Sequence, residues 1–75
     1  MISFGRVLRQ LRGKANLTQE QLGFDAHLAR NYVSSIELGQ KQPTISSIFK
    51  LAYAVGVRPS ELLKLVEDDM QKTRP

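Results

Sequence analysis

The sequence predicts an all-α fold, a compact bundle of five short helices. Apolar residues recur at helical spacing in several segments, and no segment shows the sustained two-residue alternation of a half-buried strand. Glycine, proline and capping residues also divide the chain at short intervals. The 75 residues suffice for one core. We expect one domain over residues 1–68, followed by a short polar tail over residues 69–75.

The first predicted helix begins near Ser3, which can cap it, and ends at Gly13. Asn16 follows in a turn where a left-handed backbone is expected, because asparagine tolerates that conformation better than most residues. Four apolar residues share the buried face of this helix: Phe4, Val7, Leu8 and Leu11.

The second helix has the strongest local signature of the chain. Thr18 and Gln21 have the spacing of a capping box, and Leu17 and Leu22 that of a hydrophobic staple, so its start should be firmly fixed. A turn of about three residues around His27 then leads to the third helix.

The third helix contains apolar Val33 and Ile36 and ends at Leu38 and Gly39. Ala29 occupies its cap position without a capping oxygen, which should cost about 1 kcal/mol relative to serine or threonine. Gly23 supplies the small residue needed where the second and third helices cross.

Thr44 begins the fourth helix and Gly56 closes it, while Pro59 opens the fifth. One face of the fourth helix should be apolar, with Val55 continuing it: Ile45, Ile48, Phe49 and Ala52. The fifth helix carries more apolar residues than one face of a small core can hold: Leu62, Leu63, Leu65 and Val66.

Composition excludes several classes of protein. The chain contains no cysteine and a single histidine, so we expect no disulfide, no metal site and no cofactor. It offers no Ser-His-Asp grouping, glycine-rich phosphate loop or paired carboxylates outside the charged tail, which argues against an enzyme. No apolar run approaches the roughly 18 residues that span a bilayer. We therefore expect a cytoplasmic protein without membrane contact.

Charge is unevenly distributed along the chain. The net charge is +4, and residues 1–60 carry eight basic residues against three acidic ones. A basic body suits a polyanionic partner. An ordinary solvated basic surface accounts for the charge equally well, so charge alone does not decide between the two.

Two short helices joined by a tight turn, within a basic five-helix domain, resemble the helix-turn-helix family of the phage lambda repressor and Cro, often called the Xre type. The resemblance covers residues 4–66. Its landmarks are Leu8 to Arg12, Leu17 to Leu22, Ile36 to Gly39, Pro43 with Thr44, and Leu51 to Val57. It implies binding of double-stranded DNA through the third helix.

The outward face of that helix carries the expected base-reading residues. Arginine can pair with guanine and asparagine with adenine in the major groove, and serine hydroxyls can meet several base edges. We expect this role for Arg30 and Asn31, with Ser34 and Ser35 one turn further. A plain solvated face is the alternative.

By resemblance, Gln19 should bind a backbone phosphate, helped by the positive end of the second helix. Gln40 and Lys41 match a loop that grips phosphates in the family; a free surface cation is the alternative for Lys41. Tyr32 is expected to pack or to touch a phosphate. Arg12 and Glu37 occupy positions that form an ion pair in relatives.

A domain this small reads few base pairs, so a homodimer on two half-sites about 34 Å apart is expected. Its interface is expected to include Val57, Leu63 and Val66, although these residues could simply complete the core. Repression from an operator is the expected mode of action. An antitoxin that binds a toxin, a regulator that touches polymerase, and a restriction-modification controller remain open.

Overall fold

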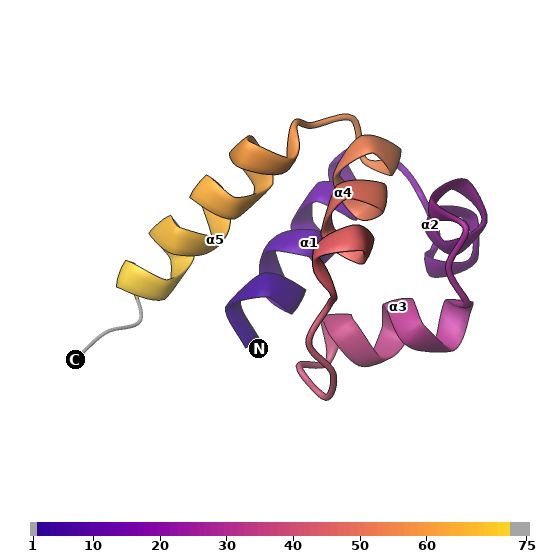
Figure 1. Ribbon diagram of the computed structural model, residues 1–75, viewed down its shortest axis with the longest axis horizontal. Coiled ribbons are helices and arrows are strands. Elements are labelled where there is room, and N and C mark those ends of the chain that lie inside the picture. The colour runs from indigo at the N-terminus through magenta and orange to yellow at the C-terminus, as the bar shows by residue number, and fades with distance from the viewer. Residues whose placement is uncertain (1, 73–75) are drawn as a thin grey trace.

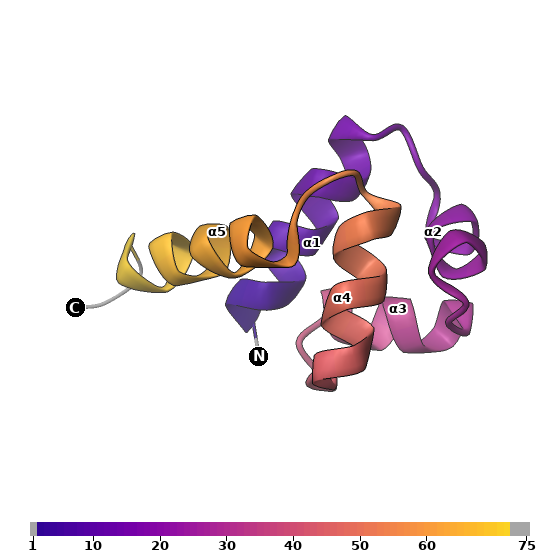
Figure 2. The same cartoon turned by 45° about the horizontal axis from the view of Figure 1, so that its top comes forward.

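The computed structural model describes residues 2–72, which form five helices and no strand (Figure 1). This confirms the predicted all-α class. The helices are α1 (Ile2–Lys14), α2 (Gln19–Ala26), α3 (Arg30–Glu37), α4 (Ile45–Ala54) and α5 (Pro59–Lys72). Within the described range, no helix is both long enough and apolar enough to cross a membrane. The short α2 and α3 lie at one end of the molecule, and the C-terminal part of α5 at the other (Figures 1 and 2).

Two helix ends differ from the expected positions. The first helix runs through Gly13 to Lys14, and the chain turns at Asn16, whose φ of 58° is left-handed as expected. The last helix continues to Lys72, past the expected domain boundary at residue 68. An ion pair of 2.9 Å between Arg6 and Asp69 attaches this extension to α1. Residues 73–75 of the expected tail lie outside the described residues.

All five helices contribute to one core. In Figure 2, α5 lies beside α1, and α4 lies between these two helices and α2. The buried apolar side chains are Phe4, Val7, Leu8, Leu22, Ala26, Val33, Ile36, Leu51, Ala52, Val55, Leu62 and Val66. In α5, Leu62 and Val66, four residues apart, are buried, whereas Leu63 and Leu65 remain partly exposed. The core therefore takes up two of the four apolar residues of this helix, and the other two stay at the surface.

The buried face of α4 is only partly the predicted one: Ala52 and Val55 are buried and Ile48 packs against the core, as expected. Ile45 is 76% exposed and Phe49 46% exposed, while Leu51 and Ala52 are fully buried. Two overlapping helical patterns share Ile48 and Ala52, and packing against α2 and α5 selects the one that includes Leu51. Buried Ser47 fits this face because its hydroxyl accepts a hydrogen bond of 3.0 Å from the capping Thr44 hydroxyl.

A close crossing of α1 and α3 depends on Gly5. A Cβ atom at this position would press against the carbonyl oxygen of Ile36 and lie 2.6 Å from that of Glu37. Both obstacles are backbone atoms, which cannot turn aside as a side chain can. The two helices can therefore approach this closely only with glycine at position 5.

Gly5→Ala should lower the free energy of unfolding by about 1–3 kcal/mol, because the added methyl overpacks the crossing. Gly13→Ala is the matched control, since a Cβ there meets no other atom within 4 Å. The control should be neutral or stabilising by up to about 1 kcal/mol, because alanine favours the helix. Urea unfolding of both variants measures this, and equal stabilities of the two would contradict the role given to Gly5.

Candidate nucleic-acid interface

The start of α2 is fixed by the capping box that the sequence predicted. The Thr18 hydroxyl accepts a hydrogen bond of 3.0 Å from the backbone N–H of Gln21, and the Gln21 side chain accepts one of 2.9 Å from the N–H of Thr18. The first intrahelical bond joins the N–H of Leu22 to the Thr18 carbonyl at 2.9 Å. The N-terminus of α2 therefore has a defined position and direction.

The turn between α2 and α3 is tight for two reasons. His27 adopts a left-handed φ of 57°, which reverses the chain directly after α2. Gly23 lets Leu28 approach, because a Cβ atom at position 23 would lie 2.7 Å from the Leu28 carbonyl oxygen. The Leu28 N–H then donates to the Gly23 carbonyl at 2.8 Å. Residues 18–38 thus form two abutting helices, a helix-turn-helix.

One side of α3 is buried and the other is polar and accessible. Val33 and Ile36 have no exposed surface. Arg30 and Asn31 are exposed, and Ser34 and Ser35 are half-buried. This helix runs along the edge of the molecule in Figure 1. Its four predicted base-reading residues are brought together on one strip.

The loop after α3 is anchored to the helix. The N–H groups of Gln40 and Lys41 donate to the Ser35 carbonyl at 2.9 and 3.3 Å, and both side chains are exposed beside the polar strip. Tyr32 is half-buried, and its hydroxyl accepts a hydrogen bond of 3.3 Å from the N–H of Thr44. Tyr32 therefore packs against the core and ties α3 to the start of α4.

Arg12 and Glu37 form a bidentate ion pair between α1 and the end of α3. Their closest atoms, Nε and Oε2, are 2.7 Å apart, and the Glu37 side chain is only 4% exposed. Arg12 also donates to the Leu17 carbonyl at 3.0 Å. The hydrogen bonds that Arg12 donates to the Glu37 carboxylate raise the pKa of Arg12 above its usual value. The pair attaches the C-terminal end of α3 to the body of the domain.

Sequence reasoning missed a third member of this cluster. The Gln19 side chain, predicted to face a phosphate, donates to Glu37 at 3.1 Å through its amide nitrogen. Gln19 and Glu37 lie eighteen positions apart, so no local pattern joins them. Only an indirect sign of this contact was present in the sequence: Gln19 is the first residue of α2, and a helix-turn-helix brings the start of α2 towards the end of α3.

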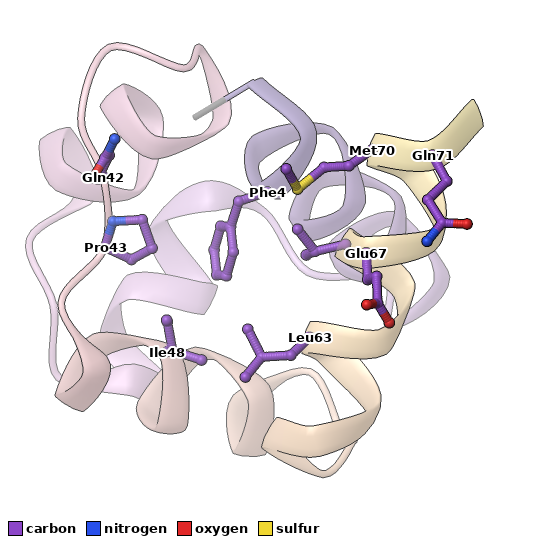
Figure 3. A pocket seen from close by; sticks show the side chains of 9 residues that line it. Phe4, Gln42, Pro43, Ile48, Leu63, Glu67, Met70 and Gln71 are labelled. Carbon is purple, nitrogen blue, oxygen red and sulfur yellow. The ribbon is translucent and has the colours of Figure 1, made fainter. Parts of the chain in front are cut away.

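The three predicted interface residues differ in their accessibility. Leu63 is 46% exposed, Val57 is half-buried against the core, and Val66, at 4% exposure, belongs to the core and offers almost no surface to a partner. Leu63 borders an apolar groove of about 600 Å³. In Figure 3 the side chains of Phe4, Ile48 and Leu63 point into this groove.

This arrangement of two crossed helices within a basic five-helix domain defines the class. The helix-turn-helix family model matches residues 8–62, and the chain belongs to this family of DNA-binding transcriptional regulators, of the Xre or lambda-repressor type.

Several relatives are controller proteins. The chain is 43% identical over 61 residues to the control protein C.BamHI of Bacillus amyloliquefaciens, covering 80% of this chain and 75% of that protein. It is 35% identical over 69 residues to the control protein C.MunI of a Mycoplasma species, covering 91% and 93% of the two chains. The crystal structure of the restriction-modification controller protein C.AhdI from Aeromonas hydrophila has a TM-score of 0.79 and 43% identity, over 81% of this chain and 92% of that one.

Glu37→Ala should lower the free energy of unfolding by about 3 kcal/mol, because it leaves Arg12 without its partner. Asp25→Ala is the control, since Asp25 is an exposed carboxylate on α2; surface changes of this kind stay within about 0.5 kcal/mol. Thermal and urea unfolding provide the measurement. A Glu37→Ala protein that melts with the parent would contradict a stabilising ion pair.

Proposed function

We propose that the protein binds a specific DNA operator as a homodimer, with α3 of each subunit in the major groove. One observation carries this proposal. The side of α3 that bears Val33 and Ile36 is fixed in the core, so its strip from Arg30 to Ser35 has only one direction in which to project. The proposal assigns base reading to that strip.

The chemistry of the strip suits base edges. Arg30 can donate two hydrogen bonds to guanine, and the Asn31 amide can both donate to and accept from adenine. Ser34 and Ser35 lie one turn further along the helix, where their hydroxyls can serve as donors or acceptors. A family helix presents its N-terminal residues to the bases, which agrees with the greater exposure of Arg30 and Asn31.

Phosphate contacts would flank the strip. Gln19 stands at the start of α2, where the unpaired N–H groups and helix dipole favour an anion. Gln40 and Lys41 stand in the exposed loop that follows the C-terminal end of α3, the end at which Gln19 contacts Glu37. Such contacts fix the register of the protein on the duplex without reading sequence. Tyr32 would contribute by holding this loop in place through Thr44.

A dimer would be formed through α5 and the adjoining groove. Leu63 exposes apolar surface at the edge of the groove, and half-buried Val57 precedes α5. Val66 is left out of this interface because it is buried within the subunit. A twofold arrangement would place the two α3 helices on half-sites about 34 Å apart.

Repression by occupying an operator is the simplest mode of action for so small a regulator. A role as controller of a restriction-modification system is the second candidate, supported by the similarity to C.BamHI and C.AhdI, each 43% identical. In that role the operator would lie beside genes for a methyltransferase and a nuclease. A toxin or a polymerase as protein partner has no comparable support.

Selection from a random DNA pool should enrich an inverted repeat, and Asn31→Ala and Arg30→Ala should each weaken binding to it by about 1–3 kcal/mol per half-site. The reason is the loss of a bidentate contact to one base in each half-site. Fluorescence anisotropy with the selected duplex and a scrambled duplex measures the effect.

Lys41→Ala is the matched comparison, because a phosphate contact carries no sequence information. It should weaken binding to both duplexes equally and reduce the slope of log K against log salt by about 1 per subunit, or about 2 for the dimer. If Asn31→Ala also reduced the affinity for both duplexes equally, Asn31 would not be reading a base.

Leu63→Glu should shift the protein towards monomer, because a charge would be placed in an apolar interface. Leu65→Glu is the control: Leu65 is exposed to a similar extent, 40% against 46%, but does not line the groove. Sedimentation velocity across a concentration series measures the state. If the Leu63→Glu protein formed a dimer as stable as that of the parent protein, the interface would not include the groove beside Leu63.

A further inference from the structure

The Glu37 carboxylate does more than pair with Arg12. Its Oε2 accepts a hydrogen bond of 2.7 Å from Arg12 Nε, and its Oε1 accepts one of 3.0 Å from Arg12 Nη2 and one of 3.1 Å from Gln19 Nε2. Three N–H groups from two other helices thus converge on one side chain that is only 4% exposed. Within residues 2–72, no buried side-chain nitrogen or oxygen lacks a partner.

This convergence dictates the orientation of the Gln19 amide. A carboxylate can only accept hydrogen bonds, whereas the two ends of a glutamine amide differ, the nitrogen donating and the oxygen accepting. The nitrogen end must therefore face Glu37, and the flipped amide would set two acceptors against each other. One N–H is used by Glu37, and the second N–H on the same nitrogen remains for another acceptor.

The charges of the cluster are compatible with an anion beside Gln19. The bidentate guanidinium of Arg12 offsets the carboxylate of Glu37, so this carboxylate does not present an uncompensated negative charge to the α2 N-terminus. One shallow hollow on the surface at this point is bordered by Arg12, Leu17, Thr18, Gln19, Glu20 and Arg30, so the exposed Glu20 carboxylate is offset there by the exposed Arg30 guanidinium. The cluster joins the first residue of α2 to the last residue of α3.

We propose that Glu37 is a positioning residue for DNA binding: it fixes the Gln19 amide in the orientation that donates to a backbone phosphate, and so keeps that contact in register with α3. The inference rests on the proposed DNA-binding function and deepens it. Its consequence is that Glu37 influences affinity through Gln19, in addition to docking α3 onto α1.

The first test uses the unaltered protein without DNA. The side-chain NH₂ of Gln19 should have an NMR order parameter close to the value of about 0.85 typical of rigid backbone, whereas that of a flexible side chain falls below about 0.6. Gln10, exposed on α1, serves as the mobile reference. Equal mobility of the two glutamines would overturn the proposal, whatever the DNA affinity.

The second test is a double-mutant cycle measured well below the melting temperature of each variant. Glu37→Gln supplies a single accepting oxygen where three donors converge, so Gln19 loses its fixed partner. Glu37→Gln and Gln19→Ala should each weaken binding to operator and scrambled duplexes alike, by about tenfold, the loss expected for one hydrogen bond to a charged group. Gln10→Ala should leave both affinities unchanged.

The double variant separates positioning from simple docking. If Glu37 acts through Gln19, the double variant should bind about as tightly as either single variant. A loss near one hundredfold, the product of the two single losses, would show independent roles and overturn the proposal. Failure of the underlying function has a different signature, since the parent protein itself would then show no salt-sensitive DNA binding. If Glu37→Gln does not fold, the NMR comparison decides alone.

Discussion

The complete burial of Val33 and Ile36 determines which side of α3 is exposed. These two side chains pin α3 against the domain, and the helix repeat then forces Arg30, Asn31 and Ser34 to the opposite side. A rotation of α3 that moved either apolar residue outward would expose hydrophobic surface and break the core. The direction of the polar strip from Arg30 to Ser35 is therefore set by buried residues and follows from the packing of the core.

Much of the fold could be predicted because the residues that begin and end its helices act locally. The Thr18 capping box, the left-handed residues Asn16 and His27, and the glycine stops at Gly39 and Gly56 each depend on nearby residues only. On α4, Ile45 and Phe49 were wrongly predicted to be buried because two apolar patterns overlap there, and only contact with other helices distinguishes them. The continuation of α5 to Lys72 was not predicted, because the ion pair between Asp69 and Arg6 joins residues that are far apart in the sequence.

In the candidate site too, features set by local sequence could be predicted, and features set by contacts between helices could not. The polar strip of α3 followed from helical spacing, and the Arg12 and Glu37 positions followed from family resemblance. The hydrogen bond between Gln19 and Glu37 and the close approach at Gly5 could not be read from the sequence, because both arise where separate helices meet. Long-range geometry of this kind emerges only when the whole fold is assembled.

Without a side-chain cap, α3 depends on tertiary contacts for its stability. Ala29 stands at the cap position with no hydroxyl or carboxylate to bind the first N–H groups, as the sequence indicated, so this eight-residue helix gains little from its own ends. Contacts from its neighbours must hold it instead: Gly23 at the turn, Gly5 beneath its C-terminal end, and the Arg12 ion pair at Glu37. An uncapped N-terminus also leaves the start of α3 unobstructed by a capping side chain, next to Arg30 and Asn31. The domain thus stabilises α3 from the interior side and leaves its N-terminal end accessible.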